Sequence, residues 1–240
     1  MNSALQQKST TEEIRTRFDQ DVERFSQLET GQQSTIDAPI SLELITEAAQ
    51  YTTPHAQSIL DIGCGAGNYT LKMLSKVPNL NCTLVDLSLP MLERAQERVA
   101  AITSGNIEIV QADIREAEFA DEQFDIILAG AVLHHLREDA EWEAVFQKLY
   151  RLLKPGGSIW ISDLVMHESP AVQQMLWHKY GAYLEGLGGA EYREKVFAYI
   201  EKEDTPRSVN YQLALLKQVG FRQVEVLHKN LCFAAFGAVK

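Results

Sequence analysis

Short apolar runs alternate along the chain with stretches in which apolar residues recur every three or four positions. The runs predict five buried strands, which read SILDIG, NCTLVDL, NIEIVQAD, FDIILAG and SIWISDL. The stretches between them predict helices, one over 67–77, one capped by Ser88 and one over about 137–153, with the sequence KPGG as the turn after the last. Strands that alternate with helices indicate a parallel sheet that is covered on both faces.

The two ends of the chain depart from this alternation. Apolar residues at helical spacing predict a first helix from Thr11 to about Leu28 and a second over about 36–50, with Ser34 or Thr35 as its N-cap. The polar residues before Thr11 predict a frayed end.

The alternation also stops after Met166. Residues 167–206 contain no strand pattern and predict two or three helices, which we interpret as an inserted lid. A helix then ends at Gly220, a typical C-cap, and two final strands joined by a tight turn are expected to be antiparallel to each other.

These patterns predict a doubly wound, Rossmann-like α/β fold in three parts. Residues 1–52 form a helical cover, residues 53–165 and 207–240 form the main domain, and residues 166–206 form the helical lid.

Candidate binding residues stand where three successive strands end. Gly63, Gly65 and Gly67 follow the first strand, Asp86 ends the second and Asp113 ends the third. Ligands in such sheets bind beyond the carboxyl ends of the strands, where glycines admit the ligand and a carboxylate can accept ribose hydroxyls. Taken singly, each feature also fits a tight turn, a solvated strand end or a helix cap. Together they indicate a site for a nucleoside-containing ligand.

The motifs ILDIGCGAGNYT, LVDLSLPMLERA, VQADI, FDIILAGAVLHHL and LLKPGGSIWISD, in this order, resemble those of class I S-adenosylmethionine-dependent methyltransferases. The resemblance covers roughly residues 57–165, and the ending GFRQVEVLHKNLCFAAFGAVK is similar as well. It implies a seven-stranded sheet of order 3-2-1-4-5-7-6 with strand 7 antiparallel. It also implies S-adenosyl-L-methionine as the cofactor and S-adenosyl-L-homocysteine as the product.

The resemblance also assigns cofactor contacts to particular residues of this chain. Gly63, Cys64 and Gly65 would lie along the methionine part and the ribose, and Asp61 would support their loop. Asp86 would hold the ribose hydroxyls, and Ala129 would line the methionine side. The residues implied to contact adenine are Leu87, Met91, Asp113 and Ile114.

Outside the core motifs, the chain is similar to the enzymes that make carboxy-S-adenosylmethionine for tRNA wobble-uridine modification. Those enzymes grip the extra carboxylate with an arginine in the inserted helices. The corresponding place here falls near Phe197, and the nearest arginine, Arg193, is about one helical turn away. An unpaired buried carboxylate is costly. We therefore expect ordinary S-adenosylmethionine and transfer of its methyl group to a small-molecule acceptor, with the carboxylated cofactor as the alternative.

Candidate catalytic and substrate residues lie after the fourth and fifth strands. His134 is our first choice of general base, since an imidazole exchanges protons near neutral pH. Packing against the cofactor or capping of the next helix is the alternative role for it. Asp163 is a candidate substrate contact at the same rim. The aromatic residues of the lid are expected either to line the acceptor site or to pack the lid on the sheet; they are Trp177, Tyr180 and Tyr183.

Composition narrows the possible partners. The net charge of −11 and the absence of a basic stripe disfavour a nucleic-acid substrate. The three cysteines lack metal-ligand spacing, so no metal site is expected. No signal peptide or transmembrane run is apparent, which favours a cytoplasmic protein without membrane contact. A homodimer through the lid or the N-terminal helices and a noncatalytic cofactor-binding protein remain open alternatives. The GxGxG spacing, Asp113 and the final antiparallel strand pair disfavour a nicotinamide-dependent oxidoreductase.

Overall fold

A computed structural model describes residues 8–27 and 32–240 of the chain. Within these residues a seven-stranded sheet has the order β3-β2-β1-β4-β5-β7-β6. Its strands are β1 (Ser58–Ile62), β2 (Asn81–Asp86), β3 (Ile107–Gln111), β4 (Phe124–Gly130), β5 (Leu153–Leu164), β6 (Gln223–Asn230) and β7 (Phe233–Val239). All neighbouring pairs are parallel except those of β7, which runs antiparallel to β5 and β6. The predicted fold class, strand order and direction are confirmed.

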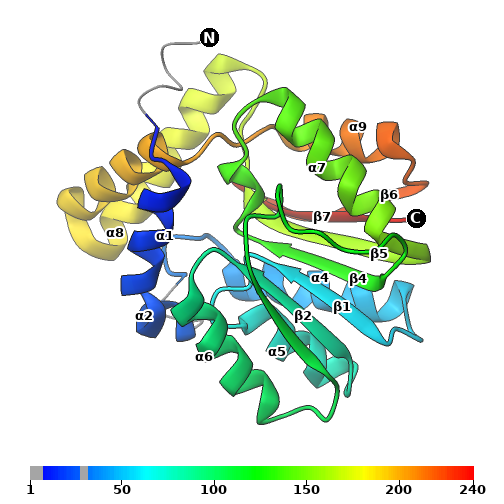
Figure 1. Cartoon of the computed structure of the whole chain (residues 1–240). Coiled ribbons are helices and arrows are strands. Elements are labelled where there is room, and N and C mark those ends of the chain that lie inside the picture. The colour runs from blue at the N-terminus through cyan, green and yellow to red at the C-terminus, as the bar shows by residue number, and fades with distance from the viewer. Residues whose placement is uncertain (1–7, 28–31) are drawn as a thin grey trace.

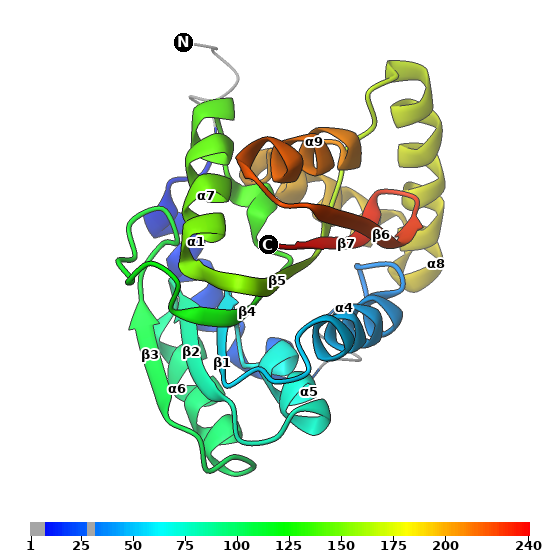
Figure 2. The same ribbon diagram turned by 90° about the vertical axis from the view of Figure 1, so that its right-hand side faces the viewer.

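Helices cover both faces of this sheet and the edge where its parallel strands end. The helical elements are α1 (Thr11–Gln20), α2 (Val22–Ser26), α4 (Ala38–Thr52), α5 (Asn68–Lys76), α6 (Leu89–Ala100), the 3-10 helix η2 (Leu133–His135), α7 (Asp139–Leu152), α8 (Pro170–Glu203) and α9 (Val209–Val219). Figure 1 shows α7 and α9 above the sheet, α4, α5 and α6 below it, and α1, α2 and α8 at its left. Figure 2 shows α4 and α5 on the face opposite α7 and α9.

Two apolar cores, one on each face, hold the layers together. Trp142 and Phe146 of α7 are buried against one face. Met73 of α5 and Leu92 of α6 are buried against the other. A third cluster joins α8 to the end of β7 around Tyr180. With both faces closed, the carboxyl ends of the strands are where a ligand can approach the sheet.

The N-terminal helices differ from their predicted boundaries. The first ends at Gln20, and Asp21 leaves helical geometry with φ −106° and ψ 12° before α2 begins. The predicted last residue, Leu28, and the tail 1–7 lie outside the described residues. Helix α4 is capped by Asp37 rather than by Ser34 or Thr35. Asp37 adopts a left-handed conformation because His228 and Asn230 of β6 hold its carboxylate.

Of two later segments, the first differs from its prediction and the second agrees with the two or three helices that were predicted. KPGG is the beginning of β5 rather than a free turn, because Leu153 pairs with Phe124 across a shift in register. The region after Met166 contains two helical segments within α8, separated by the non-helical pair Gly188 and Gly189. Among the described residues, every helix is too short or too polar to cross a lipid bilayer.

Candidate active site

Two adjoining cavities open at the carboxyl ends of the strands. Their volumes, including space open to solvent, are about 440 and 700 Å³, which suits small ligands. Both cavities are lined by Gly63, Asp86, Leu87, Val132 and His135. These shared walls make the two cavities one continuous site. We call the smaller one the adenine cavity and the larger one the acceptor cavity, after the assignment made below.

The turn after β1 leaves room for a ligand only because glycine stands at its sharpest point. Gly63 has φ +62°, and a Cβ there would lie 2.6 Å from Cγ2 of Val132. Gly65 has φ +50° and open space where a Cβ would be. The backbone N–H of Cys64 donates to Val85 of β2, which fixes the turn on the neighbouring strand. The turn therefore exposes backbone to the cavity, and α5 begins directly after it.

Asp86 holds the turn in place from the end of β2. One carboxylate oxygen accepts from the N–H of Gly65 at 2.8 Å and the other from that of Ser88 at 2.9 Å. Burial raises the pKa of Asp86 despite these hydrogen bonds. Asp19 of α1 adds a repulsive charge nearby, and its Oδ1 is buried without a hydrogen-bond partner among the described residues. Hydroxyl donors from a ligand would satisfy this excess of acceptor oxygens.

Asp61 lies one layer below the cavity. Its Oδ2 accepts from the N–H and the hydroxyl of Thr70, at 3.2 and 2.6 Å, and its Oδ1 has no partner in the described part of the chain. Burial raises the pKa of Asp61 to about 7. A buried carboxylate oxygen without a partner is costly, so a ligand ammonium group nearby would relieve it.

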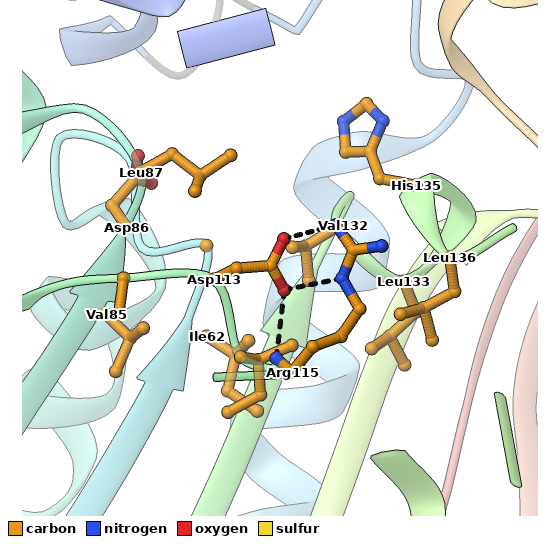
Figure 3. A pocket seen from close by; sticks show the side chains of 13 residues that line it. Ile62, Val85, Asp86, Leu87, Asp113, Arg115, Val132, Leu133, His135 and Leu136 are labelled. Atoms are coloured by element: carbon orange, nitrogen blue, oxygen red, sulfur yellow. Dashed lines mark hydrogen bonds and ion pairs between the residues drawn. The ribbon is translucent and has the colours of Figure 1, made fainter. Parts of the chain in front are cut away.

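Asp113 faces the adenine cavity, but Arg115 already contacts its carboxylate. The guanidinium donates to both oxygens, at 2.9 and 2.6 Å, and the backbone N–H of Arg115 donates to Oδ1 at 2.9 Å (Figure 3). Burial alone would raise the pKa of Asp113, but these contacts with Arg115 outweigh it and lower the pKa. The carboxylate therefore stays ionised and can accept one more donor.

The other predicted cofactor residues divide into those that line a cavity and one that does not. Cys64, Met91 and Ile114 are lining residues. Ala129 is fully buried in β4, and the lining residues that follow it are Gly130, Ala131 and Val132. That prediction placed the contact one residue too early.

The structure does not place His134 at the cavity. Its ring is buried between two carboxylates, with Nδ1 hydrogen-bonded to Asp163 and Nε2 3.6 Å from Asp204. Burial by itself lowers the pKa of His134, but the charges of Asp163 and Asp204 raise it to about 9. His134 is thus a buried cation rather than a base facing the acceptor. The neighbouring His135 lines both cavities instead.

The prediction that Asp163 contacts the substrate at the rim is also corrected, because its side chain is buried. Its oxygens accept from the ring and the N–H of His134 and from the N–H of Leu164. His134, His135 and Asp204 each offer an atom within 4.8 Å of the others, a grouping that a metal ion could occupy. Nδ1 of His135 and Oδ1 of Asp204 lie 3.3 Å apart, and neither has a hydrogen-bond partner among the described residues.

The aromatic residues of α8 do not line either cavity. The ring of Trp177 stacks on Phe197 at 4.8 Å, and Tyr180 is buried in the cluster beneath α8. The hydroxyls of Tyr180 and Tyr183 donate to the backbone oxygens of Ser34 and Gln33. The three aromatics therefore support the segment that leads into α4. Of their two expected roles, they have the packing role rather than that of lining the acceptor site.

The N-terminal helices supply the outer wall of the acceptor cavity. The apolar lining residues from this region are Ile14, Phe18 and Phe25, and Gln32 follows them. Asn68 of α5 donates to the backbone of Phe25 and Arg94 of α6 pairs with Glu23, so α2 is tied to the main domain. Arg17 of α1 pairs with Glu203 at the end of α8. Among the described lining residues of the acceptor cavity there is no Lys or Arg. The amphipathic spacing of the first helix was the sequence signal for this wall.

Comparisons with known proteins agree with this fold. Residues 59–157 match the family model described as a methyltransferase domain. A carboxy-S-adenosyl-L-methionine synthase from Trichodesmium erythraeum is 29% identical over 208 residues, which cover 84% of this chain and 81% of that protein. A synthase of the same name from Helicobacter hepaticus is 28% identical over 62% of each chain, so the match spans less than two thirds of that relative.

Two solved structures show the fold at lower identity. A Burkholderia thailandensis 1,6-didemethyltoxoflavin-N1-methyltransferase superposes with a TM-score of 0.66 at 16% identity, over 97% of this chain and 91% of that one. Human N-acetylserotonin methyltransferase superposes with a TM-score of 0.61 at 17% identity, over 94% of this chain and 56% of that one. The first was solved with S-adenosylhomocysteine and the second with S-adenosylmethionine. Residues 59–157 thus match a methyltransferase domain, and the sheet order and fold are those of S-adenosylmethionine-dependent methyltransferases.

Proposed function

We propose that the chain transfers the methyl group of S-adenosylmethionine to a small, uncharged acceptor held in the acceptor cavity. The observation that carries this proposal is the composition of that cavity. Its walls combine the glycine turn with Phe18, Phe25 and Tyr69, and among the described residues they include no cation.

The residues at the turn fit S-adenosylmethionine by their unsatisfied polar groups. Asp86 lines both cavities and can accept ribose hydroxyls, while Asp19 and Asp61, which are not among the lining residues, each have a buried oxygen without a partner in the described part of the chain. Leu87 and Ile114 give the adenine cavity apolar walls, and Asp113 provides an acceptor at its edge. These donor and acceptor types match the polar groups of the cofactor.

When bound, this cofactor supplies a methyl group on a sulfonium, which is a good leaving group. The protein must align the acceptor with that methyl and exclude water, which can contribute roughly 7–11 kcal/mol toward the barrier. The apolar side chains of α1 and α2 close the acceptor cavity on its outer side. Because α2 is tied to α5 and α6 and α1 to the end of α8, this wall would be held in position for the reaction.

The acceptor should carry no negative charge and should present a hydrogen-bond donor. A buried carboxylate or phosphate would have no cationic partner here and would be costly. The amide oxygen of Gln32 is buried in the cavity wall without a partner among the described residues, so it can accept an O–H or N–H. One structural relative was solved with the heterocycle 1,6-didemethyltoxoflavin, an acceptor of this general kind.

A second candidate function is synthesis of carboxy-S-adenosylmethionine, which the names of the curated relatives favour. The position of Arg193 opposes it. Arg193 pairs with Glu185 and Glu194 and does not line either cavity, and Phe197 is stacked on Trp177. The extra carboxylate of that product would therefore lack the arginine it needs.

Calorimetric titration with S-adenosylmethionine and S-adenosylhomocysteine tests the cofactor assignment. We expect both to bind, and Asp86→Ala to weaken binding by about 1–3 kcal/mol because the ribose hydroxyls lose their acceptor. The matched control is Asp121→Ala, which removes an exposed carboxylate whose partner is Arg151. Binding that is absent in the parent chain, or equally affected by both substitutions, would contradict the assignment.

Turnover tests the acceptor class. Release of S-adenosylhomocysteine should be detected with neutral phenols, hydroxyindoles or heterocyclic amines. It should not be detected with their carboxylated analogues, because the cavity offers those no cation. Equal turnover of a neutral acceptor and its carboxylated analogue would refute the proposed acceptor class.

A further inference from the structure

The ring of His135 lines both cavities and is packed against neighbouring side chains. It is the one imidazole among the described lining residues, its side chain is 18% exposed, and it comes from η2, directly after β4. Figure 3 shows its ring on the opposite side of the adenine cavity from Asp86 and Leu87. Phe18 of the cover meets the ring edge-on at 6.3 Å between centroids. The ring is thus placed where cofactor and acceptor would meet.

A buried carboxylate lies behind this ring. Oδ1 of Asp204 is 3.3 Å from Nδ1 of His135, and the side chain of Asp204 is only 2% exposed. Asp204 directly follows α8, 69 positions from His135 in the chain, so the contact depends on the tertiary fold. Neither of these two atoms has a hydrogen-bond partner among the described residues. A proton on Nδ1, donated to this carboxylate, would satisfy both atoms and leave Nε2 free to accept a proton from the cavity side.

Asp204 is held in place by contacts independent of His135. Its N–H donates to Ile200, and its carbonyl accepts from Lys8 at 2.6 Å. The next residue, Thr205, donates to the carbonyl of His134 at 2.7 Å, which joins the end of α8 directly to η2. Arg137 bonds to the backbone of Glu203 on the same segment. These contacts fix the carboxylate relative to the ring.

His134 and Asp163 complete the arrangement on the side away from the cavity. Nε2 of His134 lies 3.6 Å from Asp204, while its Nδ1 is bonded to Asp163. A cationic His134 favours the ionised form of Asp204: burial alone would raise the pKa of Asp204, but the charge of His134 and the contact with His135 lower it. The order Asp163, His134, Asp204, His135 therefore runs from the core to the cavity.

We propose that His135 is the general base for the acceptor and that Asp204 is the residue that positions it. This inference rests on the proposed methyl transfer. The acceptor oxygen or nitrogen forms a bond to the methyl carbon as the carbon–sulfur bond breaks, and the electron pair of that bond returns to sulfur. The proton of the acceptor moves to Nε2 of His135 and then to solvent. Charge balances, since the sulfonium becomes a neutral thioether and His135 becomes cationic.

Charged groups from several elements surround this base. Asp204 and His134 lie on the core side, and Asp113, paired with Arg115, lies across the adenine cavity. Arg137 and Lys8 approach from the far side of Asp204. The nearest of these groups, Asp204, is the anion that would stabilise a protonated His135 during the reaction.

The proposal is tested by the tautomer of His135, read from its two ring nitrogens by NMR of the full chain labelled with ¹⁵N-histidine and bound to S-adenosylhomocysteine. His135→Gln assigns the signal. We expect the Nδ1–H tautomer in the parent chain, and a shift toward Nε2–H in Asp204→Asn that Asp204→Glu largely reverses. With an acceptor that supports turnover, His135→Gln should lower kcat by about 10²–10⁴-fold.

Each contrary outcome would overturn the proposed base without overturning the cofactor assignment. An Nε2–H tautomer in the parent chain overturns the base, even if Asp204→Asn does not fold. So does a tautomer that Asp204→Asn leaves unchanged. A metal ion that copurifies at one per chain and is lost in Asp204→Asn would assign the cluster to a cation instead. In all these cases, calorimetry with S-adenosylhomocysteine shows separately whether the chain binds the cofactor product, and so whether the cofactor assignment is correct.

Discussion

The two sides of the active site are built in different ways. On the side assigned to the cofactor, the glycine turn and Asp86 stand at the ends of adjacent strands, and Asp86 holds Gly65 from only 21 positions away in the chain. On the acceptor side, the wall comes from α1 and α2, and the proposed base depends on Asp204 at the end of α8. The first side is local in sequence, whereas the second exists only after distant segments have packed together.

This difference suggests how the two sides would vary. Substitutions on the cofactor side should affect the fold and cofactor binding together, because the same backbone serves both. Substitutions on the acceptor side should change the cover or the proposed base and leave the sheet in place. The following predictions test that separation, from the largest expected effect to the smallest.

Gly63→Ala should show the largest loss of stability. The added Cβ would meet Val132 at 2.6 Å and sit at a positive φ, so we expect about 2–5 kcal/mol of destabilisation from strain and overpacking. Urea unfolding measures it. Gly65→Ala is the matched control, because it has a positive φ but open space at the Cβ. It should cost only about 1–2 kcal/mol, while still obstructing the ligand. Equal destabilisation by both would contradict the role of Val132.

The free energy of unfolding should fall as pH rises from about 7 to above 9. The pKa of His134 is raised from 6.5 to about 9 in the folded chain, because the charges of Asp163 and Asp204 outweigh burial. Its stabilisation is therefore complete below the unfolded pKa and is lost as pH rises through the folded one, on the order of 2–3 kcal/mol. His134→Gln should be less stable at pH 6.5 and should lose this part of the pH dependence. A profile that the substitution leaves unchanged would refute the buried cation.

Tyr180→Phe and Tyr183→Phe should have the smallest effects and should show whether these side chains support the fold or bind the acceptor. Removing the hydroxyl that donates to Ser34 should cost about 1 kcal/mol of stability, since the buried carbonyl loses its donor. Tyr183→Phe, whose bond is solvent-exposed, should cost less. Thermal unfolding gives both values, and neither change should alter the KM for an acceptor. A large rise in that KM would restore these aromatics as part of the acceptor site.

The sequence predicted what depends on local pattern. The apolar runs predicted the strands, and the family resemblance predicted their order. Gly63, Asp86 and Asp113 stand at the ends of adjacent parallel strands, which bring them together. The N-cap of α4 could not be predicted, because Asp37 is stabilised by β6, nearly 200 residues away.

The choice between the two histidines shows the same limit. His134 and His135 are adjacent, and only the direction of η2 decides which ring faces the cavity. That direction is fixed by Asp163 of β5 and by the bond from Thr205. Neither contact leaves a signal in the motif LHHL itself, so the sequence could indicate an imidazole at this position but not the correct one.

The most direct test of the uncharged acceptor cavity is a comparison of affinities by calorimetry. The parent chain is titrated with S-adenosylmethionine and with carboxy-S-adenosylmethionine under the same conditions. We predict that S-adenosylmethionine binds at least about tenfold more tightly, since the extra carboxylate would be buried without a cation at a cost of 1 kcal/mol or more. Tighter binding of the carboxylated cofactor, lost in Arg193→Met, would contradict the account and favour the function of the curated relatives.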